Sequence, residues 1–359
     1  MSSPAKKERE RAPKRRQRST SHVDDVVLSL LIGATNVFLL FGVFVATPTL
    51  VLYAACYHPF IAAPSALLYA LLSFDGSERG KGRPWPAFSE RFWLFTGARH
   101  FFRMSVRVPE SLGPNEMTDK SQYVFGLHPH GVCADYRLPF DGMIAEHLHK
   151  LRSWRVLVAS VLFKFPVVRE LCLWTHCVDG SRPTAEHCLA QGHSLFVVPG
   201  GEIEQLMTEH GKEVVYLRRR SGFVRLALAR GCPVVPVYVF GANDLYRTSR
   251  IFYGARSWLV RRARVCVPIF WGMLGLPVPY RVPLTIVFGD PIVLDGGGGN
   301  GGNGGRTGGS GTGSGGWGAV GPPPEAVVAA HEKYVEALVQ LFDRHKAEFG
   351  YGDRALKVV

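Results

Sequence analysis

Residues 123–131 have the sequence YVFGLHPHG, in which an apolar run ends at two histidines, a proline and a glycine. The run Tyr123–Leu127 predicts a short buried β-strand, since it is apolar, aromatic-rich and followed by turn-forming residues. In open α/β sheets ligands bind beyond the carboxyl ends of the strands, so His128 and His130 occupy a position expected for a functional site. Histidine transfers protons near neutral pH, and Gly131 permits close main-chain approach. A structural or metal-binding pair of histidines is the alternative for this motif.

The chain from residue 75 onward alternates apolar runs with helical patterns. The runs that predict strands are Val156–Val161, Ser194–Val198, Val214–Leu217, Pro233–Phe240 and Thr285–Phe288. Helices are predicted over Ser221–Arg230, which Gly231 follows, and over residues 325–349, where apolar side chains recur at helical spacing. The alternation predicts an α/β domain over residues 75–359, with a mixed, mostly parallel sheet flanked by helices.

A second motif, PGGEIE at residues 199–204, also follows a predicted strand. Gly200 and Gly201 can present main-chain N–H groups to an oxyanion or a phosphate. Glu204 is placed to orient a histidine across a cleft. Asp135, which follows His130 by five residues, is the other acid that can hydrogen-bond an imidazole and set its tautomer. A tight turn with a capping glutamate is the alternative for this motif.

A third motif, RRRSGF at residues 218–223, puts Arg218 and Arg220 at the start of a predicted helix. Guanidinium groups near a helix N-terminus make an anion site, so these arginines are candidates for binding phosphate. A solvated charged surface is the alternative.

The seven cysteines are scattered without CxxC pairs, which indicates a reducing compartment rather than a disulfide framework. Cys133 is a candidate acyl nucleophile, although packing is the simpler interpretation. The chain lacks the GxSxG, GxxxxGK[ST] and HExxH motifs. No metal is predicted, because the remaining cluster matches no common zinc spacing; its members are Cys172, His176, Cys177, His187 and Cys188.

The N-terminal part divides into a basic tail, residues 1–25, and a long apolar stretch. Residues 26–74 contain no Asp, Glu, Lys or Arg. A spanning helix needs ~20 apolar residues, so this stretch predicts a membrane hairpin whose second half, residues 50–74, is interrupted by prolines. Basic residues on both sides then assign both chain ends to the cytosol. The run is too long and starts too late for a cleaved signal peptide; a buried soluble hairpin is the alternative.

Charge and composition bear on the partners. The net charge is +13, and residues 1–20 carry eight Lys or Arg against two Glu. Because so much of the charge lies in the tail, no nucleic-acid partner is predicted. Residues 75–120 combine aromatic side chains with arginines, which suits a helix at a bilayer interface. Residues 296–316 hold 14 glycines and predict a disordered surface loop.

These elements occur in an order that resembles the type-2 diacylglycerol acyltransferase family, which includes monoacylglycerol and wax-alcohol acyltransferases. The resemblance covers residues 26–359 apart from the Gly-rich insert. The matching segments are the apolar hairpin, HPHG at 128–131, PGG with Glu204, RSGFVRLA at 220–227, VPVY and FG within 235–241, FGDPI at 288–292 and the final helix around 334–350.

The resemblance implies acyl transfer from acyl-CoA, as co-substrate, to the hydroxyl of a neutral lipid at the endoplasmic reticulum membrane and lipid droplets, with no cofactor. It implies a fold like that of glycerolipid acyltransferases and a catalytic role for His130. Diacylglycerol is the expected acceptor, giving triacylglycerol; monoacylglycerol, fatty alcohols and the oligomeric state stay open. A non-catalytic lipid-droplet-binding protein that keeps the fold is the alternative from another class.

The predicted mechanism is direct transfer without a covalent enzyme intermediate. His130, next to His128 in the motif, takes the proton of the lipid hydroxyl as the oxygen attacks the thioester. Glu204 or Asp135 stabilises the imidazolium. The remaining predicted site residues are Gly131, Gly200 and Gly201 at the oxyanion or its turns, and Arg218 and Arg220 at the phosphates of CoA.

Overall fold

A computed structural model of the chain describes residues 27, 30, 31, 47–73, 75–113, 116, 117, 121–294 and 321–359. The predicted basic tail, residues 1–25, and the Gly-rich segment, residues 296–316, lie outside the described residues.

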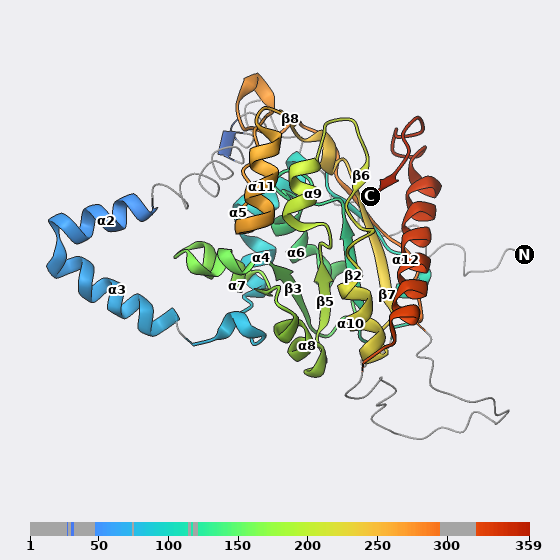
Figure 1. Ribbon diagram of the computed structural model, residues 1–359, viewed down its shortest axis with the longest axis horizontal. Helices are drawn as coiled ribbons and strands as arrows, with labels where there is room; N and C mark the ends of the chain where they lie inside the picture. The colour runs from blue at the N-terminus through green and yellow to red at the C-terminus, as the bar shows by residue number, and fades with distance from the viewer. Residues whose placement is uncertain are drawn as a thin grey trace, which may run out of the picture.

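A seven-stranded mixed sheet forms the centre of the structure, in the order β1-β10-β7-β2-β5-β3-β4 (Figure 1). The five strands from β7 to β4 run parallel, whereas β10 is antiparallel to β7 and β1 is parallel to β10. The strands are β1 Ser105–Arg107, β2 Val124–His128, β3 Trp154–Val158, β4 Cys177–Asp179, β5 Ser194–Val197, β7 Val234–Phe240 and β10 Thr285–Phe288. Two small sheets pair β6 Val214–Val215 with β11 Lys357–Val358, and β8 Arg247–Thr248 with β9 Phe270–Trp271.

The central strand β2 carries the first histidine motif. It is buried along its whole length and lies between β7 and β5, with Phe125 opposite Phe196 in β5 and His128 opposite Tyr238 in β7. The Phe125 and Phe196 rings stack with centroids 4.4 Å apart, and burial of each ring contributes roughly 1.5–3 kcal/mol. Because β2 and β5 are parallel, the HPHG and PGG motifs leave the sheet at the same edge.

Helices cover both faces of the sheet and enclose one apolar core on each. One core lies under α5 Trp93–Phe101, α6 Arg137–His147 and α7 Val168–Trp174, and α4 Pro86–Arg91 contacts α6 beside it. The other lies under α8 Arg182–Ala190, α10 Gly222–Arg230 and α12 Pro324–His345. Figure 1 shows α12 running along the sheet beside β7. Gly231 ends α10 in the left-handed region, as its place in the sequence predicts.

The prediction of a membrane hairpin over residues 26–74 is wrong for this fold. The chain forms α2 Thr47–Tyr57 and α3 Pro59–Ser73, which break at His58. At 1.5 Å per residue these helices are roughly 16 and 22 Å long, against ~30 Å of bilayer hydrocarbon. No helix in the described part of the chain is both long and apolar enough to cross a membrane. The assignment of both chain ends to the cytosol rested on that hairpin and loses its basis.

The basic, aromatic segment 75–120 is partly buried, and its position at a bilayer interface stays a prediction. Phe95, Phe101 and Phe102 are buried in the core. The Arg99 guanidinium donates to the main-chain oxygens of Pro139, Glu90 and Ser89. Arg99 therefore serves tertiary structure, because it joins the end of α4 to α6.

Candidate active site

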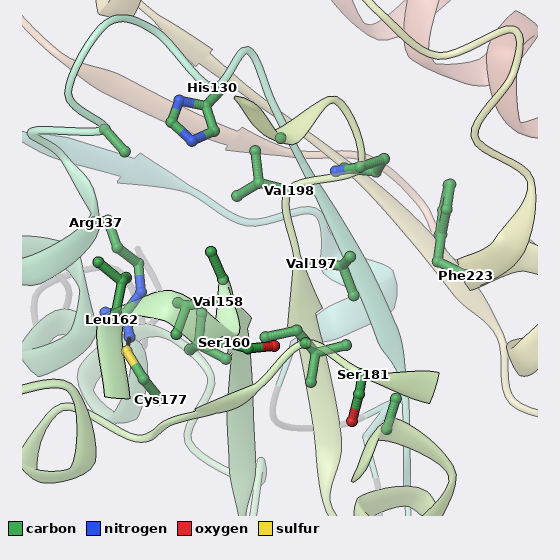
Figure 2. Close-up of a pocket in the computed structure, with 18 of the residues that line it drawn as sticks. His130, Arg137, Val158, Ser160, Leu162, Cys177, Ser181, Val197, Val198 and Phe223 are labelled. Atoms are coloured by element: carbon green, nitrogen blue, oxygen red, sulfur yellow. Dashed lines mark hydrogen bonds between the residues drawn. The ribbon is translucent and has the colours of Figure 1, made fainter. Parts of the chain in front are cut away.

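A cavity of about 2140 Å³ opens at the carboxyl edge of β2, β5 and β3. Figure 2 shows His130 at one end of it, above Val198, with Arg137, Leu162 and Cys177 further along. One part of the wall is apolar and is formed by Leu94, Phe95, Ala98, Phe102, Val156, Val158, Leu162, Val168 and Leu171. Another part is basic and includes Arg182, Arg219, Arg220 and Arg225. The volume exceeds the 300–1,000 Å³ typical of drug-sized sites and leaves room for a long, amphipathic substrate.

His130 is a half-buried residue of the cavity wall. Its ring Nδ1 lies 3.0 Å from the main-chain oxygen of Gly131. A carbonyl oxygen only accepts, so Nδ1 carries the proton and Nε2 keeps its lone pair. Burial lowers the pKa of the imidazole, although the bond to Gly131 and the charge of Glu202 act in the opposite direction. His130 is therefore neutral near pH 7, with Nε2 able to accept a proton.

Glu204 lies in α9, Gly201–Met207, and holds the main chain around His130. One carboxylate oxygen accepts from the N–H of His130 at 2.5 Å, and the other accepts from the N–H of Tyr216 at 2.6 Å. The carboxylate thus binds the backbone of His130, whereas the ring is bound by Gly131. Burial raises the pKa of Glu204 to about 7, against the effect of the two N–H donors and of the nearby Arg220.

Gly200 is required next to this carboxylate. A Cβ atom at Gly200 would lie 2.1 Å from Glu204 Oε2, which no ordinary contact allows. A second side chain of α9, Gln205, donates to the main-chain oxygen of Val132 at 2.6 Å. The PGGEIE motif and the Gln205 that follows it therefore hold the loop after β2 through hydrogen bonds to its main chain.

His128 is fully buried behind the cavity. Its Nε2–H donates to the Tyr334 hydroxyl at 3.1 Å, and Tyr334 donates to the main-chain oxygen of Gly126 at 3.2 Å. Burial, together with the charge of His331, lowers the pKa of His128 to about 3, so its ring stays neutral. The two histidines of the motif thus occupy different environments, and the cavity wall contains only the second.

The other predicted residues lie near His130 but have partners of their own. Asp135 lines the cavity and accepts from the Tyr246 hydroxyl at 2.7 Å. Gly201 also lines the cavity, but its N–H donates to Val198 O at 3.2 Å. Gly131, at φ 67°, supplies the carbonyl that binds the His130 ring. Their catalytic roles stay predictions.

The two predicted arginines differ in position. Arg220 lines the cavity beside the start of α10, its guanidinium carbon lies 5.3 Å from the centre of the Tyr216 ring, and its buried Nε has no hydrogen-bond partner in the described part of the chain. Arg218 is exposed and donates through Nε to the main-chain oxygen of Val358 at 3.1 Å. The structure brings Arg220 to the cavity and leaves Arg218 outside its wall.

Two of the cysteines considered from the sequence are buried in settings that do not suit a nucleophile or a metal ligand. Burial raises the pKa of Cys133 well above its ordinary value, so the thiol is a poor nucleophile at neutral pH. Cys177 accepts from the Arg137 guanidinium at 2.8 Å, and Nδ1 of His176 lies 2.9 Å from the Asp141 carboxylate.

Two residues next to the site were not singled out by the sequence. Tyr334 was interpreted only as part of an apolar helical stripe, which describes its core-facing position but not its bond to His128. Glu202 stands inside the quoted PGGEIE motif, and its charge acts on His130. The only feature of the sequence that could have indicated a role for Glu202 is its position as an acidic residue directly after the two glycines.

Comparisons with known proteins identify the family of this chain. A family model described as Diacylglycerol acyltransferase matches residues 65–296. Diacylglycerol O-acyltransferase 2 of Homo sapiens is 28% identical over 334 residues, which cover 87% of this chain and 77% of that protein. 2-acylglycerol O-acyltransferase 3 of Homo sapiens is 30% identical over 254 residues, covering 66% and 67%. No solved structure matches the chain.

The matched segment spans more than half of the chain and contains most of the cavity wall, so the chain belongs to the diacylglycerol acyltransferase family. This confirms the resemblance inferred from the order of the motifs.

Proposed function

We propose that this protein transfers an acyl chain from acyl-CoA to the free hydroxyl of diacylglycerol and so forms triacylglycerol. The observation that carries the proposal is the His130 imidazole, whose tautomer leaves Nε2 open at the wall of a cavity that is apolar on one side and basic on another. Acyl-CoA has matching chemistry, since its acyl chain is apolar and its nucleotide end bears phosphates.

The reaction needs one proton carrier and no covalent enzyme intermediate. Nε2 of His130 accepts the hydroxyl proton while the oxygen attacks the thioester carbon. The C–S bond breaks as the ester C–O bond forms, and the proton passes from the imidazolium to the leaving thiolate. General-base action of this kind contributes about 10²–10⁴-fold to the rate. Glu204 binds the main-chain N–H of His130 and not its ring. We therefore propose that Glu204 positions His130 and does not stabilise the imidazolium directly.

The acceptor and the place of action are part of this proposal. Diacylglycerol is favoured by the family, and the likeness to 2-acylglycerol O-acyltransferase 3 keeps monoacylglycerol as the second candidate. We place the reaction at the surface of the endoplasmic reticulum membrane and of lipid droplets, because both the acceptor and the product are neutral lipids.

One assay tests the function. Purified protein is given radiolabelled acyl-CoA with diacylglycerol, monoacylglycerol and a long-chain alcohol in parallel. Label in triacylglycerol is expected at the highest rate. Absence of label in any ester would reject the enzyme and favour a lipid-binding protein, and preference for another acceptor would replace diacylglycerol.

The pH dependence of kcat/KM reports which group limits the reaction. His130 works as a base only when unprotonated, so the rate falls as the pH drops through its pKa. Burial puts this pKa below the ordinary 6.5, and we expect the midpoint of the acid limb below pH 6.5. A midpoint near 7 would instead indicate control by Glu204, whose pKa is about 7.

Arg220 is proposed to bind a phosphate of CoA. Arg220→Ala is expected to raise KM for acyl-CoA by roughly 10–100-fold, because a hydrogen bond to a charged group contributes about 1.5–3 kcal/mol. Arg218→Ala is the matched control and should leave this KM unchanged, since Arg218 binds the main chain of Val358. Acyl-pantetheine lacks the nucleotide phosphates and should respond little to Arg220→Ala; an equal response would contradict the phosphate contact.

A further inference from the structure

A lobe at the edge of the molecule consists of residues 247–276, which we call the α11 lobe. The strands β8 and β9 pair antiparallel at its base and enclose α11 Tyr253–Ala263, and η7 Met273–Gly275 follows. Figure 1 shows β8 and α11 together at the top of the view, next to α9. The lobe is therefore one local unit attached beside the helix that carries Glu204.

The α11 lobe exposes large apolar side chains. Leu274 is 91% exposed, Phe252 76% and Trp258 63%. Smaller exposed fractions are found for Ile251, Val267 and Leu276. Exposed apolar side chains gathered on one unit indicate an interaction surface, whereas scattered ones do not.

Two arginines lie on the same face of α11 as Trp258. Arg261 and Arg262 follow Trp258 by three and four positions, so the three side chains lie on one side of the helix. Arg256 and Val260 are buried on the opposite side. Neither Arg261 nor Arg262 forms an ion pair with an acidic side chain in the described ranges. A tryptophan with arginines beside it is typical of helices that lie at the surface of an anionic bilayer.

The α11 lobe also adjoins the cavity. Residues 263–266, the last residue of α11 and the three after it, form part of the cavity wall together with His130, Cys133 and Glu202. Cys266 is close enough to Glu202 for the glutamate charge to contribute to its raised pKa. The charge of Glu202 also acts on His130, so the lobe meets the cavity at its catalytic end.

We propose that the α11 lobe docks the enzyme on a phospholipid bilayer that contains anionic lipid and that the lipid acceptor enters the cavity beside residues 263–266. Trp258, Phe252 and Leu274 insert into the headgroup region, and Arg261 and Arg262 bind lipid phosphates. The inference rests on the proposed acyl transfer for the nature of the acceptor, and it adds the surface through which that acceptor arrives.

The test compares two ways of presenting diacylglycerol to the full-length protein. Long-chain diacylglycerol is supplied in vesicles of phosphatidylcholine with a minority of phosphatidylserine, and short-chain diacylglycerol is supplied in detergent solution. One variant carries Phe252→Ser, Trp258→Ser and Leu274→Ser, and the other carries Arg261→Glu and Arg262→Glu. The helices α2 and α3 stay unchanged in both, so that any contact they make with lipid is the same.

Matched control variants lie on α12, away from the lobe. Val328→Ser removes a side chain that is 55% exposed. Lys333→Glu with Arg344→Glu makes the same change in net charge as the arginine variant at two exposed positions. All four proteins are expected to elute from size-exclusion chromatography like the unchanged protein.

We expect both lobe variants to lose at least about tenfold in rate with vesicles and to keep their rate with short-chain diacylglycerol, because the apolar side chains and the two arginines are proposed to hold the protein on the anionic bilayer. The deficit of the arginine variant should shrink in vesicles of phosphatidylcholine alone. Unchanged vesicle rates, equal losses in the α12 controls, or a lobe variant that changes oligomeric state would overturn the docking surface. Absence of acyl transfer by the unchanged protein in detergent would instead reject the proposed function.

Discussion

Replacement of His130 by alanine is expected to lower kcat for acyl transfer by about 10²–10⁴-fold, because no other described side chain is held at the cavity as a neutral base with an open nitrogen. KM for acyl-CoA should change little, since the imidazole is proposed to contact the hydroxyl and not the nucleotide. The rate is measured with radiolabelled acyl-CoA under saturating diacylglycerol.

The control for His130→Ala is His149→Ala, which removes an exposed histidine outside the cavity wall. His149→Ala should leave the unfolding temperature unchanged. His130→Ala should lower it only slightly, because the His130 ring is half-buried and makes one hydrogen bond, to the main-chain oxygen of Gly131. A His130→Ala protein with full activity would exclude the mechanism. Loss of activity together with a large drop in the unfolding temperature would assign His130 to folding.

Glu204→Gln is expected to reduce both stability and kcat. An amide offers one oxygen, so only one of the N–H groups of His130 and Tyr216 keeps its acceptor, and the other faces the side-chain NH₂. A buried donor left without a partner costs about 1–3 kcal/mol in the free energy of unfolding. The displaced main chain then moves the His130 ring away from the reacting atoms, which lowers kcat further.

Denaturant titration and kcat measured on the same preparations check this second expectation. Glu332→Gln, at an exposed position of α12, is the matched control and should leave both quantities unchanged. A Glu204→Gln protein that keeps its stability but loses activity would contradict the role of Glu204 in holding the main chain of His130 and Tyr216. It would restore the hypothesis that Glu204 acts on the His130 ring.

The pattern of the sequence determined the local elements that build the site. An apolar run followed by HPHG marked the strand β2 and the loop at its end, and the run before PGG marked β5. Both signals are local, because a buried strand and a glycine turn each follow from a few neighbouring residues. The ordered combination of motifs indicated the family.

The side-chain partners required the tertiary structure. Glu204 and His130 are 74 positions apart, and Tyr334 and His128 are 206 positions apart. The sequence allowed either Glu204 or Asp135 to bind the His130 ring. In the structure α9 packs against the loop after β2, so the Glu204 carboxylate binds the main-chain N–H of His130 instead. The choice between Arg218 and Arg220 likewise depends on which side chain faces the cavity at the start of α10.

The N-terminal apolar stretch is a second case in which the sequence pattern did not determine the tertiary structure. Residues 26–74 contain no charged side chain. Because a spanning helix needs ~20 apolar residues, that length predicted two spanning helices. The described helices α2 and α3 end at residues 57 and 73, on either side of His58, and neither reaches the length of a span. The sequence by itself thus determined which segments are apolar, which short motifs the chain contains and in what order the motifs come. Helix lengths, strand directions and the partners of His128, His130 and Glu204 were decided only by tertiary packing, because these depend on contacts between residues that are distant in the chain.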